Sequence, residues 1–436
     1  MCDCNVRRSG GRTRTATWAM LAALLGPLLL AGCVTRHREV LDEAELLAMR
    51  REYLVQAARE NIAQIDRIVD RLKREHDEAK QVGRQAPAYD VLVISGGGDY
   101  GAFGAGLLKG WSGVDDAEWV KPEFDLVTGV STGALIAPFA FVGDEETIGA
   151  VERIYQEPKD DWVLLRGLFF FMPGNPSLLN NDGLRREIDA RVDEELIAKI
   201  AACADHGRAC AVSATNLDFG IRRVWDLGYE AQSVREGRAK PDRIRAMLLA
   251  SSAIPAAFPP VELDGHLYCD GAVTSNILYN ANMRSTSSVL YRWQVRYPEL
   301  RLPRIRFWVI INAQLEQVPR IVQPNWLDVT ASATETIVRS ATAQSIELLA
   351  RELALIETTG LTNVEFRVAS IPSDWRPPVE GIFKRETMES LARLGEEMGR
   401  APRRTWHSGS PLPQQIGPAG EILEPTTAPN TGSIKR

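Results

Sequence analysis

The sequence predicts an α/β fold in which helices cover both faces of a largely parallel central sheet, preceded by an amphipathic helix. Three short apolar runs, at 91–94, 124–128 and 307–311, are typical of buried strands. Helical patterns lie between and after them, most clearly at about 328–358 and 385–399. Strands that alternate with helices favour a parallel sheet. With 436 residues, 45% of them hydrophobic and 25% charged, the chain can bury a large core.

The first 32 residues have the features of an export signal. Arginines within the first 14 residues supply a positive start, and 18–30 is an uncharged, mainly apolar run. This run is short for a membrane span and suits a signal peptide. It ends in Leu30-Ala31-Gly32-Cys33, which resembles the lipobox of bacterial lipoproteins. That resemblance implies removal of residues 1–32 and lipidation of Cys33; a plain secretory signal or an N-terminal anchor is the alternative.

The predicted location is the bacterial cell envelope. More than one lipid chain on Cys33 would hold the protein firmly at a bilayer. Val34 follows the cysteine, where Asp would favour retention in the inner membrane, so analogy with lipoproteins favours the outer membrane. The remaining sequence has no apolar run of about 18 residues, and we expect it to lie outside the bilayer.

Residues 33–88 are predicted to form the lipidated N-terminus and an amphipathic helical spacer. Apolar residues recur at steps of three and four, which places them on one helix face. This face could dock on the next domain, pair as a coiled coil, or separate the domain from the membrane. The residues of the face are Leu54, Ala58, Ile62, Ile65, Val69 and Leu72.

From residue 89 the pattern changes to that of a catalytic domain, predicted to extend to residue 400. The segment 401–436 is rich in Pro and Gly and has few large apolar residues, which predicts a disordered tail.

A nucleophile elbow is predicted at Gly129-Val130-Ser131-Thr132-Gly133. This motif follows an apolar strand and opens a helix, the context in which a sharp turn exposes a serine. Gly129 and Gly133 would let the backbones of the turn approach closely. The N-terminus of the helix would favour a developing negative charge.

A second glycine-rich turn follows the strand at 91–94. Gly96, Gly98 and Gly101 satisfy the spacing of a dinucleotide-binding loop, but that loop needs an acidic residue at the end of the next strand, where Ser131 stands instead. The favoured interpretation is an oxyanion hole, in which N–H groups of Gly96, Gly97 and Gly98 would stabilise a substrate oxyanion.

The candidate base is Asp270, in the sequence Asp270-Gly271-Ala272. A serine nucleophile needs a proton acceptor, and the chain has five histidines. In the chain order Ser, Asp, His, the histidine would have to be His407, which lies in the predicted tail. An aspartate in direct contact with Ser131 removes this difficulty.

Taken together, the glycine loop, the elbow and Asp270-Gly271-Ala272 resemble the patatin-like phospholipase family. The segments 250–255 and 258–261 resemble the family's approach to its aspartate. The resemblance covers roughly 89–315 and implies a three-layer α/β/α fold, with Ser131 as nucleophile and Asp270 as base. The sequence departs from the family at Tyr100, where a basic residue is usual.

Together with the lipobox at Cys33, the resemblance implies a membrane-anchored hydrolase of (lyso)phospholipid acyl esters that needs no cofactor and no metal. Its expected partners are the lipid bilayer and its acyl-lipid substrate. A net charge of −6 argues against nucleic acid. A carboxylesterase or thioesterase for soluble acyl compounds is the first alternative. A catalytically silent envelope scaffold, suggested by Tyr100, is the second.

Four further features remain open between functional and structural interpretations. The aromatic stretch 162–173 could line an acyl pocket, face lipid as a lid, or belong to the core. The arginines at 284–306 could meet anionic head groups, although a solvated insertion is favoured. Cys203 and Cys210 could form a disulfide. Cys269 is expected to be buried packing and not a second nucleophile.

Overall fold

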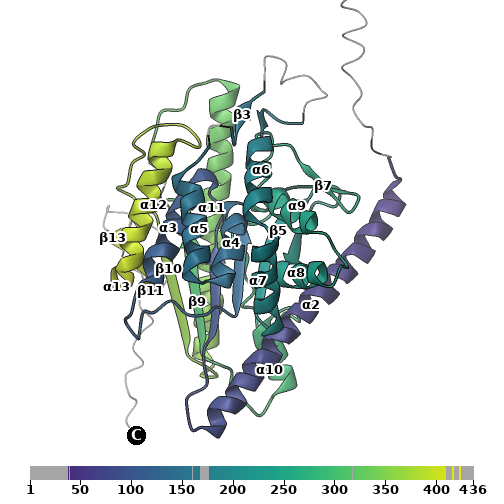
Figure 1. Ribbon diagram of the computed structural model, residues 1–436, viewed down its shortest axis with the longest axis vertical. Coiled ribbons are helices and arrows are strands. Elements are labelled where there is room, and N and C mark those ends of the chain that lie inside the picture. Colours follow the sequence, from purple (N-terminus) through teal and green to yellow (C-terminus); the bar gives the residue numbers. More distant parts are fainter. Residues whose placement is uncertain are drawn as a thin grey trace, which may run out of the picture.

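The core of the protein is a mixed, mostly parallel sheet between two layers of helices, so the predicted α/β fold class is confirmed (Figure 1). The computed structural model describes residues 38, 40–159, 161–166, 176–316, 318–408, 415–416 and 422–423. The predicted signal peptide 1–32 and the lipidation site Cys33 lie outside the described residues. No helix among those residues is long and apolar enough to cross a membrane.

The strand order in the main sheet is β11-β10-β9-β1-β2-β5-β8-β7, and β6 also pairs with β5. Strands β10, β9, β1, β2 and β5 are parallel to one another, whereas β6, β7, β8 and β11 run antiparallel to their neighbours. The strand bounds are β1 Tyr89–Ile94, β2 Leu126–Val130, β5 Ala209–Asn216, β6 Ile221–Asp226, β7 Val261–Leu263, β8 His266–Asp270, β9 Ile305–Ile311, β10 Val364–Ser370 and β11 His407–Ser408. Two small sheets pair β3 Leu164–Leu165 with β4 Leu179–Asn180, and β12 Gln415–Ile416 with β13 Ile422–Leu423.

Side chains that alternate along the central strands build two separate cores. On β1, Leu92 and Ile94 belong to one hydrophobic cluster, and Val91 and Val93 belong to the other. This alternation follows from the two-residue period of a strand and explains why β1 is apolar throughout.

Helices cover both faces of the sheet. The first core is covered by α3 Gly101–Ser112, α4 Thr132–Val142, α5 Glu145–Gln156, α6 Asp182–Arg191, α7 Glu194–Asp205, α8 Leu227–Arg235, α9 Pro241–Ser251 and α12 Arg385–Arg400. The second is covered by α2 Glu43–Gln81, α10 Val289–Arg296 and α11 Trp326–Thr358. Two short 3-10 helices, η1 Gly98–Tyr100 and η2 Gly271–Val273, follow β1 and β8.

The long helix α2 docks on the domain through its C-terminal half. Ile65, Val69 and Leu72 of the predicted apolar face are buried, whereas Leu54 is 45% exposed. Arg292 of α10 binds Asp66 in a bidentate ion pair at 2.9 and 2.7 Å. Of the three arrangements considered for this helix, the structure has the docked one.

The arginines predicted to form a solvated insertion mostly face carboxylates of the protein itself. Arg292 and Arg296 pair with acidic residues of α2, Arg304 with Glu365, and Arg306 with Asp90. The positive charges of these four arginines are therefore paired with carboxylates of the same chain.

The ordered domain extends past residue 400, where the tail was predicted to begin. After α13 Pro402–Thr405, the buried side chain of Trp406 packs against Trp111 and Trp308 with ring centroids 4.7 and 5.1 Å apart. Strand β11 then pairs with β10. The packing of Trp406 and the pairing of β11 with β10 hold this segment on the sheet.

Candidate active site

Ser131 stands in a strained turn between β2 and α4. Its backbone has φ 54° and ψ −124°, a region that residues with a side chain rarely adopt. The turn closes because Gly129 lies against the carbonyl of Gly133, and Gly133 against that of Ile94, with no room for a Cβ at either glycine. This packing orients the Ser131 hydroxyl beyond the end of β2 and accounts for both glycines of the predicted elbow.

Asp270 ends β8 and reaches Ser131 across β5. The Ser131 hydroxyl donates to Asp270 Oδ2 at 2.7 Å, and the N–H of Ala272 donates to Oδ1 at 2.8 Å. The carboxyl group is buried, and burial raises its pKa to about 6, against the opposing effect of these two hydrogen bonds. A carboxylate with this pKa and contact is suited to accept the serine proton near neutral pH.

The glycine loop lies beside Ser131, but its three glycines are not equivalent. The N–H of Gly96 donates to the carbonyl of Asn276 at 3.2 Å, so it is already engaged. Among the described residues, no hydrogen-bond acceptor is recorded for the N–H of Gly97 or Gly98. Gly98 has φ +61°, which favours glycine, and borders the same pocket as Ser131. The predicted oxyanion donors are thus reduced to Gly97 and Gly98, while Gly96 serves close packing, since a Cβ there would lie 3.0 Å from that of Ser131.

The model of the patatin-like phospholipase family matches residues 92–281. This segment contains the glycine loop, the elbow and Asp270. Residues 92–281 form a patatin-like phospholipase domain. This domain match supports a lipid acyl hydrolase in general terms.

Two further comparisons concern solved structures and curated proteins. The crystal structure of VipD from Legionella pneumophila is similar to this chain at 12% sequence identity and a TM-score of 0.35. The similarity covers 73% of this chain and 68% of that one. No match was found among the curated proteins.

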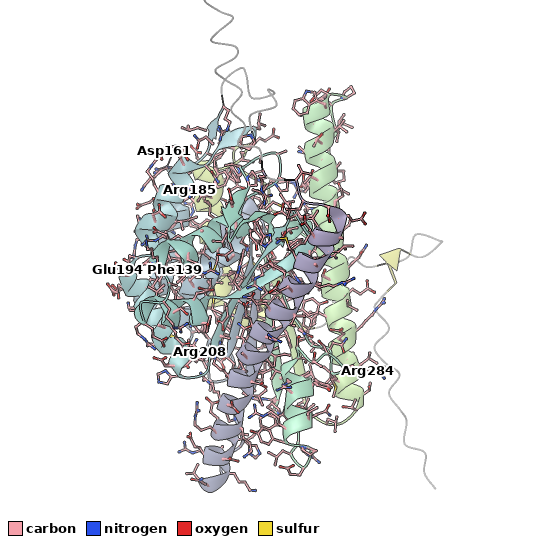
Figure 2. All side chains as sticks on the ribbon, turned by 90° about the vertical axis from the view of Figure 1, so that its right-hand side faces the viewer. Phe139, Asp161, Arg185, Glu194, Arg208 and Arg284 are labelled. Atoms are coloured by element: carbon pink, nitrogen blue, oxygen red, sulfur yellow. The ribbon has the colours of Figure 1, made fainter. Side chains whose placement is uncertain are left out.

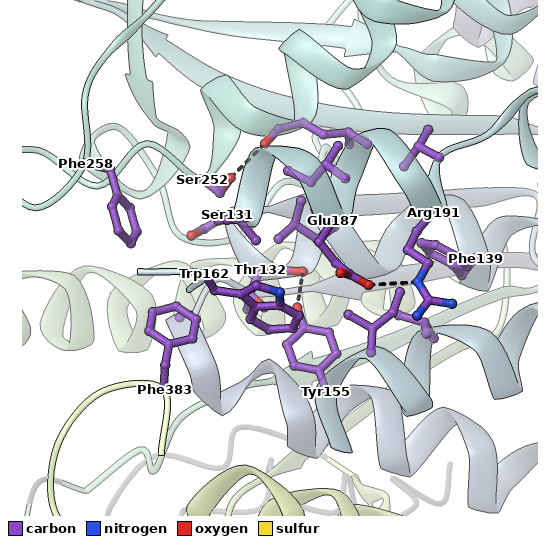
Figure 3. A pocket seen from close by; sticks show the side chains of 18 of the residues that line it. Ser131, Thr132, Phe139, Tyr155, Trp162, Glu187, Arg191, Ser252, Phe258 and Phe383 are labelled. Atoms are coloured by element: carbon purple, nitrogen blue, oxygen red, sulfur yellow. Dashed lines mark hydrogen bonds and ion pairs between the residues drawn. The ribbon is translucent and has the colours of Figure 1, made fainter. Parts of the chain in front are cut away.

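An apolar pocket opens beside Ser131 in the patatin domain and follows α4 (Figure 3). Leu135 and Phe139 line it one and two helical turns beyond Ser131. Figure 3 shows Phe258 beside Ser131 at one end and Arg191 at the other. At that far end the buried Glu187 pairs with Lys159 and with Arg191, the latter at 2.8 Å. Glu187 thus pairs with both cations at this end, and most of the remaining lining is apolar, so the pocket has the character of an acyl site.

The aromatic stretch 162–173 contributes to this pocket in its described part. Trp162 is buried and lines the cavity. The residues from 167 to 175 lie outside the described residues.

Tyr100 replaces the basic residue of the family with an aromatic contact. Its ring meets that of Trp375 edge-on at a centroid distance of 5.5 Å. Asp99, the preceding residue, accepts a hydrogen bond from the N–H of Phe383 at 2.8 Å. Burial raises the pKa of Asp99 to about 6. These contacts tie the glycine loop of the patatin domain to the loop before α12 without a charge at position 100.

Other candidate residues lie away from this chemistry. His407 is exposed on the edge strand β11, separated from β2 by three strands. Cys203 and Cys210 are free cysteines, so the expected disulfide is not formed. Cys269 is buried, which raises its pKa to about 11 and disfavours the thiolate. Within the described ranges, no cluster of His, Cys, Asp or Glu could hold a metal ion.

Two residues that support the elbow and the loop were not predicted from the sequence. Ser251 Oγ accepts the Ser131 N–H at 3.0 Å and donates to the carbonyl of Ser213 at 2.7 Å. Asn276 holds the N–H of Gly96 through its carbonyl and donates from Nδ2 to Thr342 of α11 at 2.9 Å. For Ser251 there was a sequence signal, because it belongs to the segment 250–255 that resembles the family. For Asn276 there was no sequence signal.

Proposed function

We propose that this protein is a membrane-anchored serine hydrolase that cleaves acyl esters of phospholipids or lysophospholipids. The observation that carries the proposal is the 2.7 Å hydrogen bond between Ser131 and the buried Asp270 at the mouth of an apolar pocket. In this proposal Ser131 is the nucleophile and Asp270 is the general base.

In the acylation step, Asp270 takes the hydroxyl proton as Ser131 Oγ attacks the ester carbonyl carbon. The carbonyl oxygen becomes an oxyanion, which the N–H groups of Gly97 and Gly98 would stabilise, with help from the N-terminus of α4. Collapse of the tetrahedral intermediate breaks the ester C–O bond. The proton held by Asp270 passes to the leaving alcohol, and the acyl group stays on Ser131.

In the deacylation step, Asp270 accepts a proton from a water molecule that attacks the acyl carbon. The bond to Ser131 Oγ breaks, and the serine recovers its proton from Asp270. The products are a fatty acid and the deacylated lipid, and the protein returns to its starting state.

The shape of the pocket favours long acyl chains over small soluble esters. Its lining from Ser131 to Phe139 follows α4 for about 12 Å at 1.5 Å per residue. Apolar surface of that length stabilises a bound chain with each methylene that it shields from water. The lipid on Cys33 would add a high local concentration of substrate.

The test is hydrolysis by the chain from residue 33 onward, with esters of increasing acyl length. We expect activity to rise with chain length and a fluorophosphonate probe to label Ser131. Ser131→Ala should remove both signals, and His407→Ala, the matched control at a non-site position, should keep both.

Three results would separate the alternatives. A preference for short monomeric esters throughout would support the carboxylesterase or thioesterase alternative. Absence of both labelling and turnover in the folded parent protein would support the silent scaffold. Activity that depends on His407 and not on Asp270 would overturn the assigned base.

A further inference from the structure

The N-terminal half of α11 projects from the body of the protein. In Figures 1 and 2 the upper end of this light-green helix extends above the sheet. Most positions from 326 to 340 are exposed. The described part of the fold leaves this helix end largely exposed, so packing in the core does not account for its apolar residues.

The projecting end lies on the same side of the sheet as Ser131. Helix α11 connects the parallel strands β9 and β10, so it starts beyond their carboxyl ends, where Ser131 follows β2. Thr342 of α11 contacts Asn276, which in turn holds Gly96 of the glycine loop. From Thr342 back to Trp326 the helix rises about 24 Å at 1.5 Å per residue. The tip therefore extends well beyond the level of the site.

The tip is apolar and nearly free of charge. Its exposed side chains are Ile321 at 89%, Val322 at 39%, Trp326 at 63%, Val329 at 50% and Ile337 at 68%. Val322, Val329 and Ile337 line one shallow hollow, so they form a continuous patch. Between 321 and 334 the one charged residue is Asp328.

Paired ionic residues lie at the base of the apolar tip, where Glu335 and Arg339 flank Ile337 in the sequence. Glu335 pairs with Arg320 at 3.3 Å and with Arg339 at 2.7 Å. An apolar end that carries a tryptophan and is bordered by paired charges matches the polarity change between the acyl and head-group regions of a bilayer.

We propose that this apolar tip of α11, formed by Ile321, Val322, Trp326, Val329 and Ile337, inserts into the surface of a lipid bilayer and directs the Ser131 pocket toward it. The inference deepens the proposed function, since it takes the bilayer as the source of the substrate. The tip binds lipid through its own apolar surface, independently of turnover.

The position of Arg38 supports a bilayer as the occupant of this surface. Arg38 is held by Asp218 at 2.5 and 2.9 Å and by the carbonyl of Gly265 at 2.8 Å. Cys33 is five residues earlier, and an extended chain of that length spans about 17 Å. A lipid on Cys33 would thus keep the membrane close to the β7–β8 hairpin, which lies in the upper half of Figure 1, as the tip does.

The experiment measures binding without the anchor. The chain from residue 33 onward with Cys33→Ser is mixed with vesicles of phosphatidylcholine and phosphatidylglycerol and sedimented. The tip variant combines Ile321→Ser, Trp326→Ser and Val329→Ser. The matched control combines Val120→Ser, Val295→Ser and Leu355→Ser, which are 48%, 57% and 67% exposed at positions outside the tip.

We expect the tip variant to lose at least tenfold in vesicle binding and the control variant to bind like the parent. Both should hydrolyse a short monomeric ester at the parental rate, which also shows that they fold. Equal vesicle binding by the tip variant and the parent would overturn the proposal. So would a parent that is a dimer in solution and a tip variant that is a monomer, because a second copy would then cover the tip.

Failure of the proposed function would look different. Ser131→Ala should bind vesicles like the parent, because binding does not need the nucleophile. If the parent shows tip-dependent vesicle binding but hydrolyses no ester, the proposed role of the tip is supported and the proposed hydrolase activity is contradicted.

Discussion

At the scale of single residues, the burial of Asp270 has a direct consequence for the pH profile. Its pKa of about 6 means that the carboxyl is protonated in acid and cannot accept the Ser131 proton. We expect kcat/KM for a soluble ester to fall below about pH 6. Ser131→Ala and Asp270→Asn should each lower kcat by a factor on the order of 10³ or more, and the double variant should be no worse than either. A flat profile between pH 5 and 8 would contradict the assignment of the base.

The same carboxylate should destabilise the fold at neutral pH. Because burial raises its pKa from 3.8 to about 6, the folded state binds the proton more tightly than the unfolded state. The unfavourable contribution is full above about pH 6 and disappears as the pH falls below about 4. We expect Asp270→Asn to raise the free energy of unfolding by about 1–3 kcal/mol at pH 8, and by less at pH 5.

Urea unfolding at the two pH values measures this difference. Glu357→Gln, at an exposed position, is the control and should change neither value. A loss of stability at pH 8 in Asp270→Asn would mean that the hydrogen bonds of the carboxylate outweigh its desolvation.

The residues of the site differ in how far the sequence could reveal them. The elbow could be predicted because its turn depends on local sequence. Asp270 was predicted from the scarcity of histidines and from its order after the glycine loop and the elbow. The engagement of the Gly96 N–H by Asn276 was not, since the two residues are distant in the chain and meet through the sheet. The family resemblance of the segment 250–255 pointed to the region of Ser251 but not to its hydrogen bond with the Ser131 N–H.

At the scale of elements, helix α2 is held by charge as well as by its apolar face. Arg71 lies 3.2 Å from Asp125, which is 3% exposed and whose pKa burial raises to about 7. Arg71→Met would leave that carboxyl without its cation. We expect a loss of about 2–4 kcal/mol in unfolding free energy at pH 8 and a smaller loss at pH 6, where Asp125 is mostly protonated.

Arg74→Met on the same helix is the matched control, since Arg74 is exposed. Its unfolding free energy should stay within about 0.5 kcal/mol of the parent at both pH values. Equal losses at pH 6 and pH 8 for Arg71→Met would point to lost packing in place of lost charge.

The C-terminal segment makes a second element that can be tested. Trp406 is 3% exposed and packs on Trp111 and Trp308. Trp406→Ala should lower the free energy of unfolding by about 3–5 kcal/mol in chemical denaturation. Truncation after Ser408 should leave it unchanged, whereas a chain that ends at Ala401 should lose as much as the Trp406 variant or more.

Periodicity predicted α2 and part of its buried face, but it could not predict where α2 docks. Its ionic partners come from segments as distant as α10, and no pattern in residues 43–81 specifies them. The ordered domain also extends beyond the predicted boundary at residue 400. The prediction used the average composition of the segment 401–436, which does not reveal that the single residue Trp406 is buried against the domain.

At the scale of the whole molecule, the proposed lipid on Cys33 decides where the enzyme works. Cys33→Ser should prevent lipidation, so the protein should accumulate as an unprocessed precursor or be mislocalised. Fractionation of cells and mass spectrometry of the mature N-terminus measure both outcomes. An unmodified N-terminus at another residue in the parent would contradict the lipobox interpretation.

The docking of α2 also bears on the order in which the chain can assemble. This helix is synthesised before the rest of the domain. Its hydrogen bonds from Asp66 to Arg292 and from Tyr53 to Tyr268 cannot form until those later residues are present. Contacts of such large sequence separation form late, because long loops must close first. Helix α2, which precedes the rest of the domain in the sequence, is therefore expected to be among the last elements to gain native protection. Pulse-labelled hydrogen exchange during refolding should find β1 and β2 protected while the amides of α2 still exchange.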